Sequence, residues 1–153
     1  MAKMMGGSTD TVESMMKEYL EEAGFEVTTF NPESGNGKLL LASTPVRQFV
    51  SQYDAVILVA NVSGFSQSNE RRLHWSMPMG PDIPWYVTEM PTVFVSVNNP
   101  FHLIDVPMVP TYINAYSPDR DVIRQVVEKI TGKSEFKGES TVDAFCSAWD
   151  TRL

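Results

Sequence analysis

Polar side chains suited to binding a hydroxylated ligand follow two apolar segments of this chain. Residues 55–60 and 92–97 lack the polar–apolar alternation of a half-exposed strand, which is typical of parallel strands covered on both faces. Amides and hydroxyls both donate and accept hydrogen bonds, as sugar hydroxyls require. Ligands of open α/β sheets bind outside the carboxyl ends of the strands, so the residues after these segments are candidates. The predicted substrate-facing residues are Asn61, Ser63, Gln67, Asn98 and Asn99.

Some of these residues, and the nearby His102, also have purely structural interpretations. Asn99 is placed to cap a short helix that begins at Pro100, and Asn61 suits a turn. His102 stands among apolar neighbours, which favours a packed, hydrogen-bonded histidine over a catalytic one. For the asparagines both interpretations stay open.

The stretch GGSTDT at residues 6–11 has the composition of a phosphate-binding loop. Glycines let backbone N–H groups approach an anion at the positive end of a helix. A flavodoxin-like module that binds FMN or phosphate through Ser8, Thr9 and Thr11 is therefore the alternative function to test.

The same stretch suits a plain helix cap, and the residues before it favour that interpretation. Residues 1–5 are too short and too weakly apolar for the buried strand that should carry a phosphate loop to the ligand crevice. Either the first strand is abbreviated or the chain was cut from a longer protein. We therefore expect Asp10 or Thr9 to cap the helix, Glu13 to complete a capping box, and no cofactor to bind.

Charge and hydropathy argue against several classes of partner. With 12 basic and 19 acidic side chains the net charge is −7, which repels nucleic acid. No apolar run approaches the roughly 20 residues that cross a bilayer, and residues 1–10 lack the apolar centre of a signal peptide. We expect neither nucleic acid nor a membrane as partner, and the composition assigns no compartment.

The only cysteine, Cys146, and two histidines make a thiolate or imidazole metal cage improbable, so no metal site is expected. Cys146 lies beside Phe145 and Trp149 in the sequence, and we expect it to be a small buried apolar residue.

Apolar periodicity and turn residues predict alternating helices and strands. The expected helices cover residues 12–23, 45–53, 101–104 and 119–131, and the expected strands cover residues 25–30, 55–60, 92–97 and 111–116. Buried strands that alternate with helices imply an α/β fold, here a three-layer αβα sandwich with a mainly parallel, flavodoxin-like sheet. The length suits a single domain over residues 1–153, with Phe136, Val142, Phe145 and Trp149 packing the irregular tail.

Longer motifs occur from residue 60 onward. They are ANVSGFSQ at 60–67, PTVFVS at 91–96, NPFHLIDVP at 99–107 and PTYINAYS at 110–117. Together with FKG at 136–138 and WD at 149–150, they resemble the C-terminal domain of glycoside hydrolase family 3. The resemblance is to the bacterial branch that contains β-N-acetylhexosaminidases and β-glucosidase-like enzymes.

The resemblance implies an accessory domain that packs beside a catalytic (β/α)8 barrel. The barrel would carry the aspartate nucleophile, and this chain contains neither that nucleophile segment nor the barrel's His-containing loop. It would therefore be non-catalytic by itself, with no catalytic residue of its own. Its parent would hydrolyse β-glycosidic bonds, of β-N-acetylhexosaminides or β-glucosides, and carbohydrate would reach the chain only through that parent.

Two further possibilities concern acid groups and aromatic side chains. Glu70 could be proposed as a barrel-facing acid, but Arg71 and Arg72 would hold it ionised, and Glu89 suits an exposed helix end. A complete small hydrolase therefore has no nameable pair of catalytic groups here. The loop that carries Trp75 and Trp85 is expected to seal the barrel interface.

A domain separated from its barrel would expose that interface. We expect Trp85, Tyr86 or Phe101 among its exposed residues, and self-association through this face.

Overall fold

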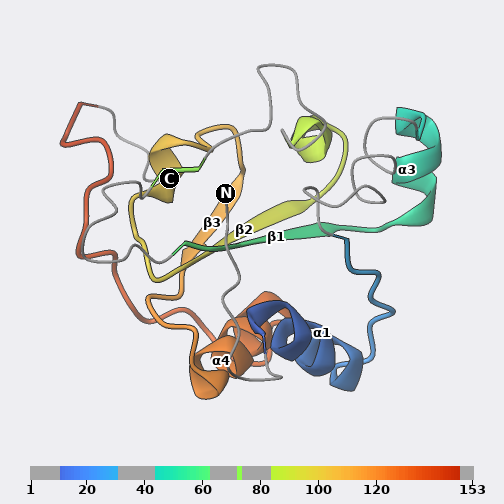
Figure 1. Ribbon diagram of the computed structural model, residues 1–153, viewed down its shortest axis with the longest axis horizontal. Helices are drawn as coiled ribbons and strands as arrows, with labels where there is room; N and C mark the ends of the chain where they lie inside the picture. Colours follow the sequence, from blue (N-terminus) through green and yellow to red (C-terminus); the bar gives the residue numbers. More distant parts are fainter. Residues whose placement is uncertain (1–10, 31–43, 63–71, 74–83, 149–153) are drawn as a thin grey trace.

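The computed structural model describes residues 11–30, 44–62, 72–73 and 84–148, in which three strands form one parallel sheet in the order β1-β2-β3. The strands are β1 (Val56–Asn61), β2 (Thr92–Val97) and β3 (Thr111–Asn114). The helices are α1 (Val12–Glu22), α3 (Val46–Gln52) and α4 (Arg120–Ile130), with the short 3-10 helices η1 (Trp85–Thr88) and η2 (His102–Ile104). Helices α1 and α4 cover one face, and α3, η1 and η2 lie on the other (Figure 1). The predicted α/β sandwich is confirmed.

The central strand β2 joins the cores on the two faces of the sheet. Its register with β1 runs from Val56↔Thr92 to Asn61↔Val97, and Val93 lies opposite Thr111 of β3. Val95 and Val97 pack against the apolar side chains of α1 and α4 on one face of the sheet. Phe94 packs in the cluster that contains Val106 on the other face. None of the helices in the described ranges is long and apolar enough to cross a bilayer.

Helix α1 begins and ends on recognisable caps. The side chain of Thr11 accepts a hydrogen bond from the backbone N–H of Ser14 at 3.1 Å, so Thr11 caps the helix, where we had expected Asp10 or Thr9. Gly24 has φ 95°, and the N–H of Phe25 donates to the carbonyl of Leu20 at 3.1 Å. This is the six-residue bond of a Schellman motif, which confirms the predicted stop at Gly24.

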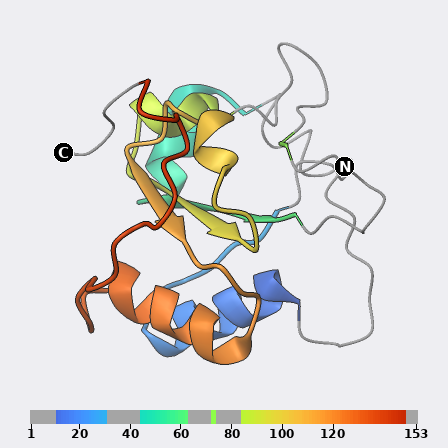
Figure 2. The same ribbon diagram turned by 90° about the vertical axis from the view of Figure 1, so that its left-hand side faces the viewer.

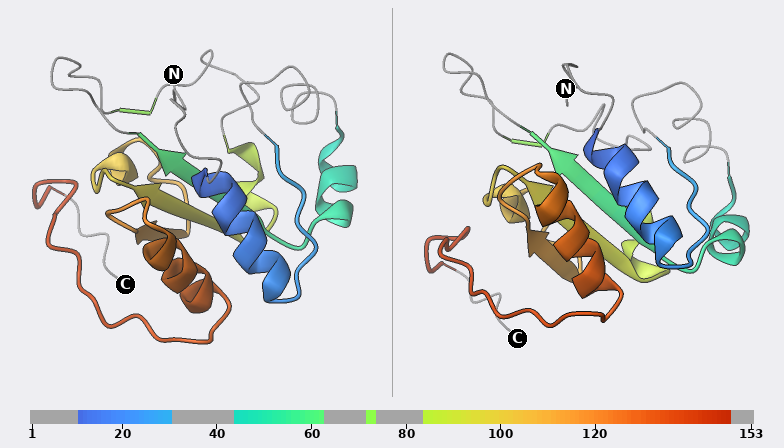
Figure 3. Two further views of the ribbon diagram at one scale, coloured as in Figure 1. Left: turned by 60° about the horizontal axis from the view of Figure 1, so that its bottom comes forward. Right: turned by 90° about the horizontal axis from the view of Figure 1, so that it is seen from below.

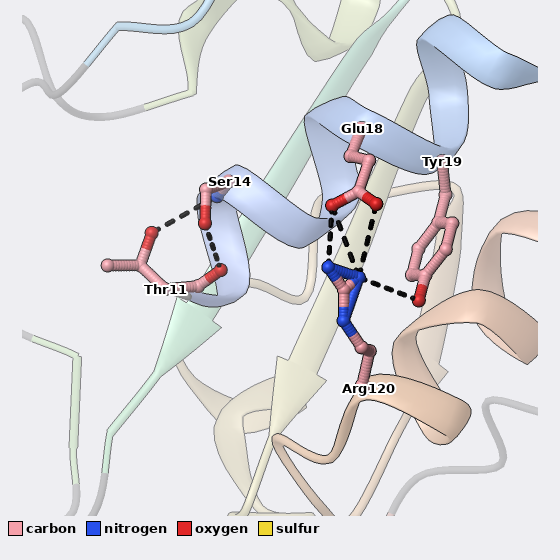
Figure 4. A network of polar contacts seen from close by, with 5 residues as sticks. All are labelled: Thr11, Ser14, Glu18, Tyr19 and Arg120. Atoms are coloured by element: carbon pink, nitrogen blue, oxygen red, sulfur yellow. Dashed lines mark hydrogen bonds and ion pairs between the residues drawn. The ribbon is translucent and has the colours of Figure 1, made fainter. Parts of the chain in front are cut away.

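Arg120, at the start of α4, links α4 to α1. Arg120 Nη2 donates to Glu18 Oε2 at 2.7 Å, and its Nη1 donates to the Tyr19 hydroxyl at 3.1 Å (Figure 4). The guanidinium also lies 5.5 Å from the centre of the Tyr19 ring. These contacts hold α1 alongside α4 beneath the sheet.

The predicted strand at residues 25–30 is wrong. These residues form no strand. Val27 nevertheless packs against the buried side chains of α1 and α4, and Phe30 packs against the cluster that contains Phe49. A strand needs a hydrogen-bonded neighbour, and β1 pairs only with β2 among the described residues. The apolar side chains of residues 25–30 do pack inward, but the described residues provide no strand with which they could pair.

Burial also corrects expectations for single residues. Val46, expected to face inward with Phe49, is exposed, because only Phe49 reaches the core from α3. Cys146 is exposed rather than buried, in a turn where its φ is 51°. Phe136 is exposed too and lies over the Lys129 ammonium instead of packing the tail against the core.

Candidate functional site

Two of the predicted polar residues meet at the carboxyl ends of β1 and β2. Asn98 Nδ2 donates to Asn61 Oδ1 at 2.6 Å, and both side chains are exposed. Figure 2 turns the left-hand side of Figure 1, where the β1 arrow ends, toward the viewer. The alignment of β1 with β2 places Asn61 opposite Val97, so the residue that follows Val97 reaches across to it.

Backbone geometry aims the Asn98 side chain at its partner. Asn98 has φ 68°, in the left-handed region that asparagine tolerates better than most residues. The pair still presents amide donors and an amide acceptor to solvent, because one hydrogen bond uses only part of the capacity of two amides. This end of the sheet can therefore bind a neutral, hydroxylated group.

Beneath this pair lies a buried network around Ser96. The Ser96 hydroxyl donates to the Asn99 carbonyl and lies 2.8 Å from His102 Nδ1. The Ser96 hydroxyl therefore links the Asn99 carbonyl to the His102 ring. His102 is 0% exposed, which confirms the prediction of a packed, hydrogen-bonded histidine.

Asn99 has a structural role, but not the predicted helix cap, because η2 begins at His102 and its N-cap residue Phe101 makes no side-chain cap hydrogen bond. The Asn99 side-chain oxygen accepts from the N–H of Phe101 at 2.9 Å, and Asn99 is buried. Asn99 therefore shapes the turn into η2 while the neighbouring Asn98 faces solvent.

Tyr112 of β3 packs above the same network. Its ring stacks on Phe94 with the ring centres 5.4 Å apart. Burial raises the pKa of the Tyr112 hydroxyl, with partial opposition from the nearby Ser96. Tyr112 is therefore a neutral packing residue at neutral pH.

A buried carboxylate ties the segment after β1 to η2. Asp105 Oδ1 accepts from Arg72 Nε at 2.6 Å, and Asp105 Oδ2 accepts from the N–H of Leu73 at 3.1 Å. The hydrogen bond and charge of Asp105 raise the pKa of the Arg72 guanidinium. Both carboxylate oxygens of Asp105 are engaged in these hydrogen bonds, so Asp105 positions this segment.

The remaining predicted residues divide between exposed positions and positions outside the described residues. Glu89 is exposed at the end of η1, as expected for a surface residue. Ser63, Gln67, Glu70 and Trp75 lie outside the described residues, as do residues 6–10 of the glycine loop. Thr11, the last residue of that loop, uses its hydroxyl to cap α1.

Sequence reasoning missed Ser96 and Asp105, although each interrupts an apolar run. A lone polar residue between apolar neighbours signals a buried partner, because an unpaired buried polar group is costly. Among the residues that the structure covers, no three His, Cys, Asp or Glu side chains gather as metal ligands would.

Comparisons with known proteins identify relatives of this chain. The chain is 41% identical over 148 residues, 97% of its length, to a "Beta-N-acetylglucosaminidase/beta-glucosidase" of Cellulomonas fimi. It also superposes on a solved structure titled "Beta-glucoside phosphorylase BglX bound to 2FGlc", with a TM-score of 0.70, 38% identity and 92% of this chain covered. No family model matches the chain.

These similarities define the chain as an α/β sandwich domain. The family resemblance drawn from the motifs is confirmed, and the chain belongs to glycoside hydrolase family 3. It spans about a quarter of the length of these relatives, 26% of the first and 23% of the second.

Proposed function

We propose that residues 1–153 form one accessory domain that supports the catalytic part of a longer β-glycosidase and has no glycosidase activity alone. The observation that carries the proposal is the match of nearly the whole chain to only 26% of a β-N-acetylglucosaminidase/β-glucosidase. By the family resemblance, the missing partner is an N-terminal (β/α)8 barrel, and the parent's substrate is a β-N-acetylhexosaminide or a β-glucoside.

The chemistry at the carboxyl ends of the strands supports a non-catalytic role. Retaining glycosidases use two carboxyl groups about 5 Å apart, one as nucleophile and one as acid. Among the described residues of this site, Asp105 carries the carboxylate, and its two oxygens accept hydrogen bonds from Arg72 and from the N–H of Leu73. The exposed groups are the amides of Asn61 and Asn98, which bind hydroxyls but do not form or protonate a glycosidic bond.

The proposed role of Asn61, Ser63, Gln67 and Asn98 is to face the sugar-binding cleft of the parent. Asn99, which we also expected there, is buried. The Asn61–Asn98 pair is the best supported, because its remaining donors and acceptor are exposed. Asn99 contributes through the turn that presents Asn98.

Two exposed aromatic residues support a contact with the barrel near this site. Phe101 follows β2 and is 48% exposed, and Tyr116 follows β3 and is 47% exposed. Aromatic residues are enriched in protein–protein interfaces. Tyr86, one of the aromatic residues expected at the interface, is buried at 1% and belongs to the core.

An activity assay tests the proposal. The purified chain is incubated at high concentration with aryl β-glucosides and aryl N-acetyl-β-glucosaminides from pH 4 to 8. Each assay is run with and without inorganic phosphate, because one relative is titled a phosphorylase. We expect release of the aryl group at the buffer rate in every case.

A matched variant separates real turnover from contamination. Activity that survives purification and disappears in Glu70→Gln would show that the chain is an enzyme and would overturn the proposal. Adding the separately produced N-terminal part of the parent is expected to restore turnover.

A further inference from the structure

Strand β2 ends in a strained turn. The N–H of Asn99 donates to the carbonyl of Val97 at 2.9 Å, and the residue between them, Asn98, has φ 68°. A hydrogen bond that spans two residues around a positive φ defines the rare and strained form of the γ-turn. The backbone therefore leaves β2 in a conformation that few residues adopt.

Strand β3 is followed by a turn of the same kind. The N–H of Ser117 donates to the carbonyl of Ala115 at 2.8 Å, and Tyr116 between them has φ 61°. For a residue as bulky as tyrosine, a positive φ is an outlier. Strained backbone of this kind gathers at functional sites, where the surrounding structure holds it in place.

The two turns occupy equivalent positions at one edge of the sheet. The strands are parallel, so their carboxyl ends share an edge, and Figure 3 shows the sheet from below with α1 and α4 in front of it. The register pairs Ser96 with Asn114, and the N–H of Ala115 donates to the Ser96 carbonyl at 2.8 Å. Counting two residues on from the Ser96–Asn114 pair brings Asn98 opposite Tyr116.

Asn61 extends this arrangement to β1. It lies opposite Val97 in the register, and its Oδ1 accepts a hydrogen bond from Asn98 Nδ2 at 2.6 Å. Asn61, Asn98 and Tyr116 are all exposed. Two amides and one aromatic ring therefore stand in a row across the ends of the three strands.

This row combines the two kinds of contact that a sugar ring can make. A pyranose with equatorial hydroxyls carries C–H groups on its faces and hydroxyls around its rim. Its faces can pack on a tyrosine ring, which removes apolar surface from water. Its hydroxyls can exchange hydrogen bonds with the two amides, which both donate and accept.

We propose that Asn61, Asn98 and Tyr116 form a binding site for one pyranose of a β-linked saccharide, with the Tyr116 ring as its stacking surface. The strain at the two turns is retained because it presents Asn98 and Tyr116 together. The β-linkage rests on the proposed function, whereas the site rests on the geometry of this chain. A contact between Tyr116 and the barrel is compatible with this role, because an aromatic ring has two faces.

Binding of single-sugar probes to the chain tests the inference. Methyl β-glucoside and methyl N-acetyl-β-glucosaminide are titrated into the isotope-labelled chain, and NMR follows the side-chain amide resonances of Asn61 and Asn98. We expect saturable shifts with a Kd of roughly 1–10 mM, as ligands of this size allow. Sorbitol, which has hydroxyls but no ring face, is the control and should give no saturable shift.

Matched variants identify the stacking ring, and their backbone spectra check that each is folded. Tyr116→Asn removes the ring but tolerates φ 61°, and should weaken binding about ten-fold, whereas Tyr116→Phe should retain it. Asn98→Gly keeps the turn, because glycine adopts a positive φ freely, and should also weaken binding. Phe136→Ser, at an exposed aromatic residue beyond the end of α4, is the control and should bind like the original chain.

Three results would contradict the inference. They are the absence of saturable shifts with both glycosides, equal shifts with sorbitol, and unchanged binding by Tyr116→Asn. If Tyr116→Asn does not fold, magnetisation transfer from the Tyr116 ring protons to the sugar C–H protons is measured in the original chain, and its absence excludes stacking.

The outcome is independent of the glycosidase assay. A chain that hydrolyses aryl glycosides contradicts the proposed function, whatever the binding data show. A chain that neither hydrolyses nor binds contradicts this inference alone and leaves the accessory role in place.

Discussion

At the scale of single residues, buried polar groups organise the loops that present the exposed ones. Ser96 bonds to the Asn99 carbonyl and contacts His102, which shapes the turn that carries Asn98. Asp105 accepts hydrogen bonds from Arg72 and Leu73 and so holds the segment that contains them. The exposed amides of Asn61 and Asn98 can meet because these buried contacts hold their backbone in place.

A buried tyrosine predicts how stability depends on pH. Burial raises the pKa of Tyr86 well above its ordinary value of 10.0, and its ring stacks on Phe49 at 5.6 Å. Below pH 10 Tyr86 is protonated in both states, so it adds no pH dependence. Above pH 10 the unfolded chain loses this proton while the folded chain keeps it, so stability falls as pH rises, by up to about 1.4 kcal/mol per pH unit.

Urea unfolding between pH 9 and 11 measures this effect. We expect Tyr86→Phe to flatten the alkaline decline by about 1 kcal/mol per pH unit relative to the original chain. Tyr116→Phe, which removes one tyrosine hydroxyl at an exposed position, is the matched control. Equal declines in the original chain and in Tyr86→Phe would contradict the prediction.

At the scale of elements, short-range caps decide where the helices begin and end. Thr11 bonds to the first turn of α1, and Gly24 ends the helix in a conformation that glycine adopts easily. Thr11→Ala should lower the free energy of unfolding by about 1 kcal/mol, because it leaves an N–H of the first turn without its side-chain partner.

Thr11→Ser keeps the hydroxyl and should retain most of that stability. Chemical denaturation of the three chains at one pH gives the comparison. The cap assignment fails if the serine variant is destabilised as much as the alanine variant.

At the scale of the whole molecule, the exposed aromatic residues beside the site should anchor the proposed partner. Phe101→Ser combined with Tyr116→Asn should weaken binding to the separately produced catalytic part of the parent by at least about ten-fold, since apolar area is lost from the interface. Asparagine is chosen at position 116 because φ there is 61°.

Calorimetric titration of the two parts measures that affinity. Phe25→Ser, at an exposed aromatic residue next to the end of α1, is the matched control and should bind like the original chain. If the control variant loses as much affinity as the double variant, the interface lies elsewhere.

Local sequence patterns were sufficient to predict α1, α4, β1 and β2. Helix periodicity, caps and continuous apolar runs depend only on neighbours within a few residues. The motifs from residue 60 onward were likewise sufficient for the family, since their similarity is contained in the letters themselves. The position of polar residues after β1 and β2 could also be expected from the sequence, because loops gather at strand ends, whereas their binding role stays a prediction.

Only the tertiary structure decided which of these residues meet. Asn61 and Asn98 are 37 positions apart, and Arg72 and Asp105 are 33 apart, so no local rule predicts either pair. Residues 25–30 carry the composition of a strand but lack its hydrogen bonds, because pairing depends on a neighbour that the local sequence does not contain. Burial of Tyr86 and exposure of Cys146 were likewise determined by the fold, since both depend on contacts distant in the chain.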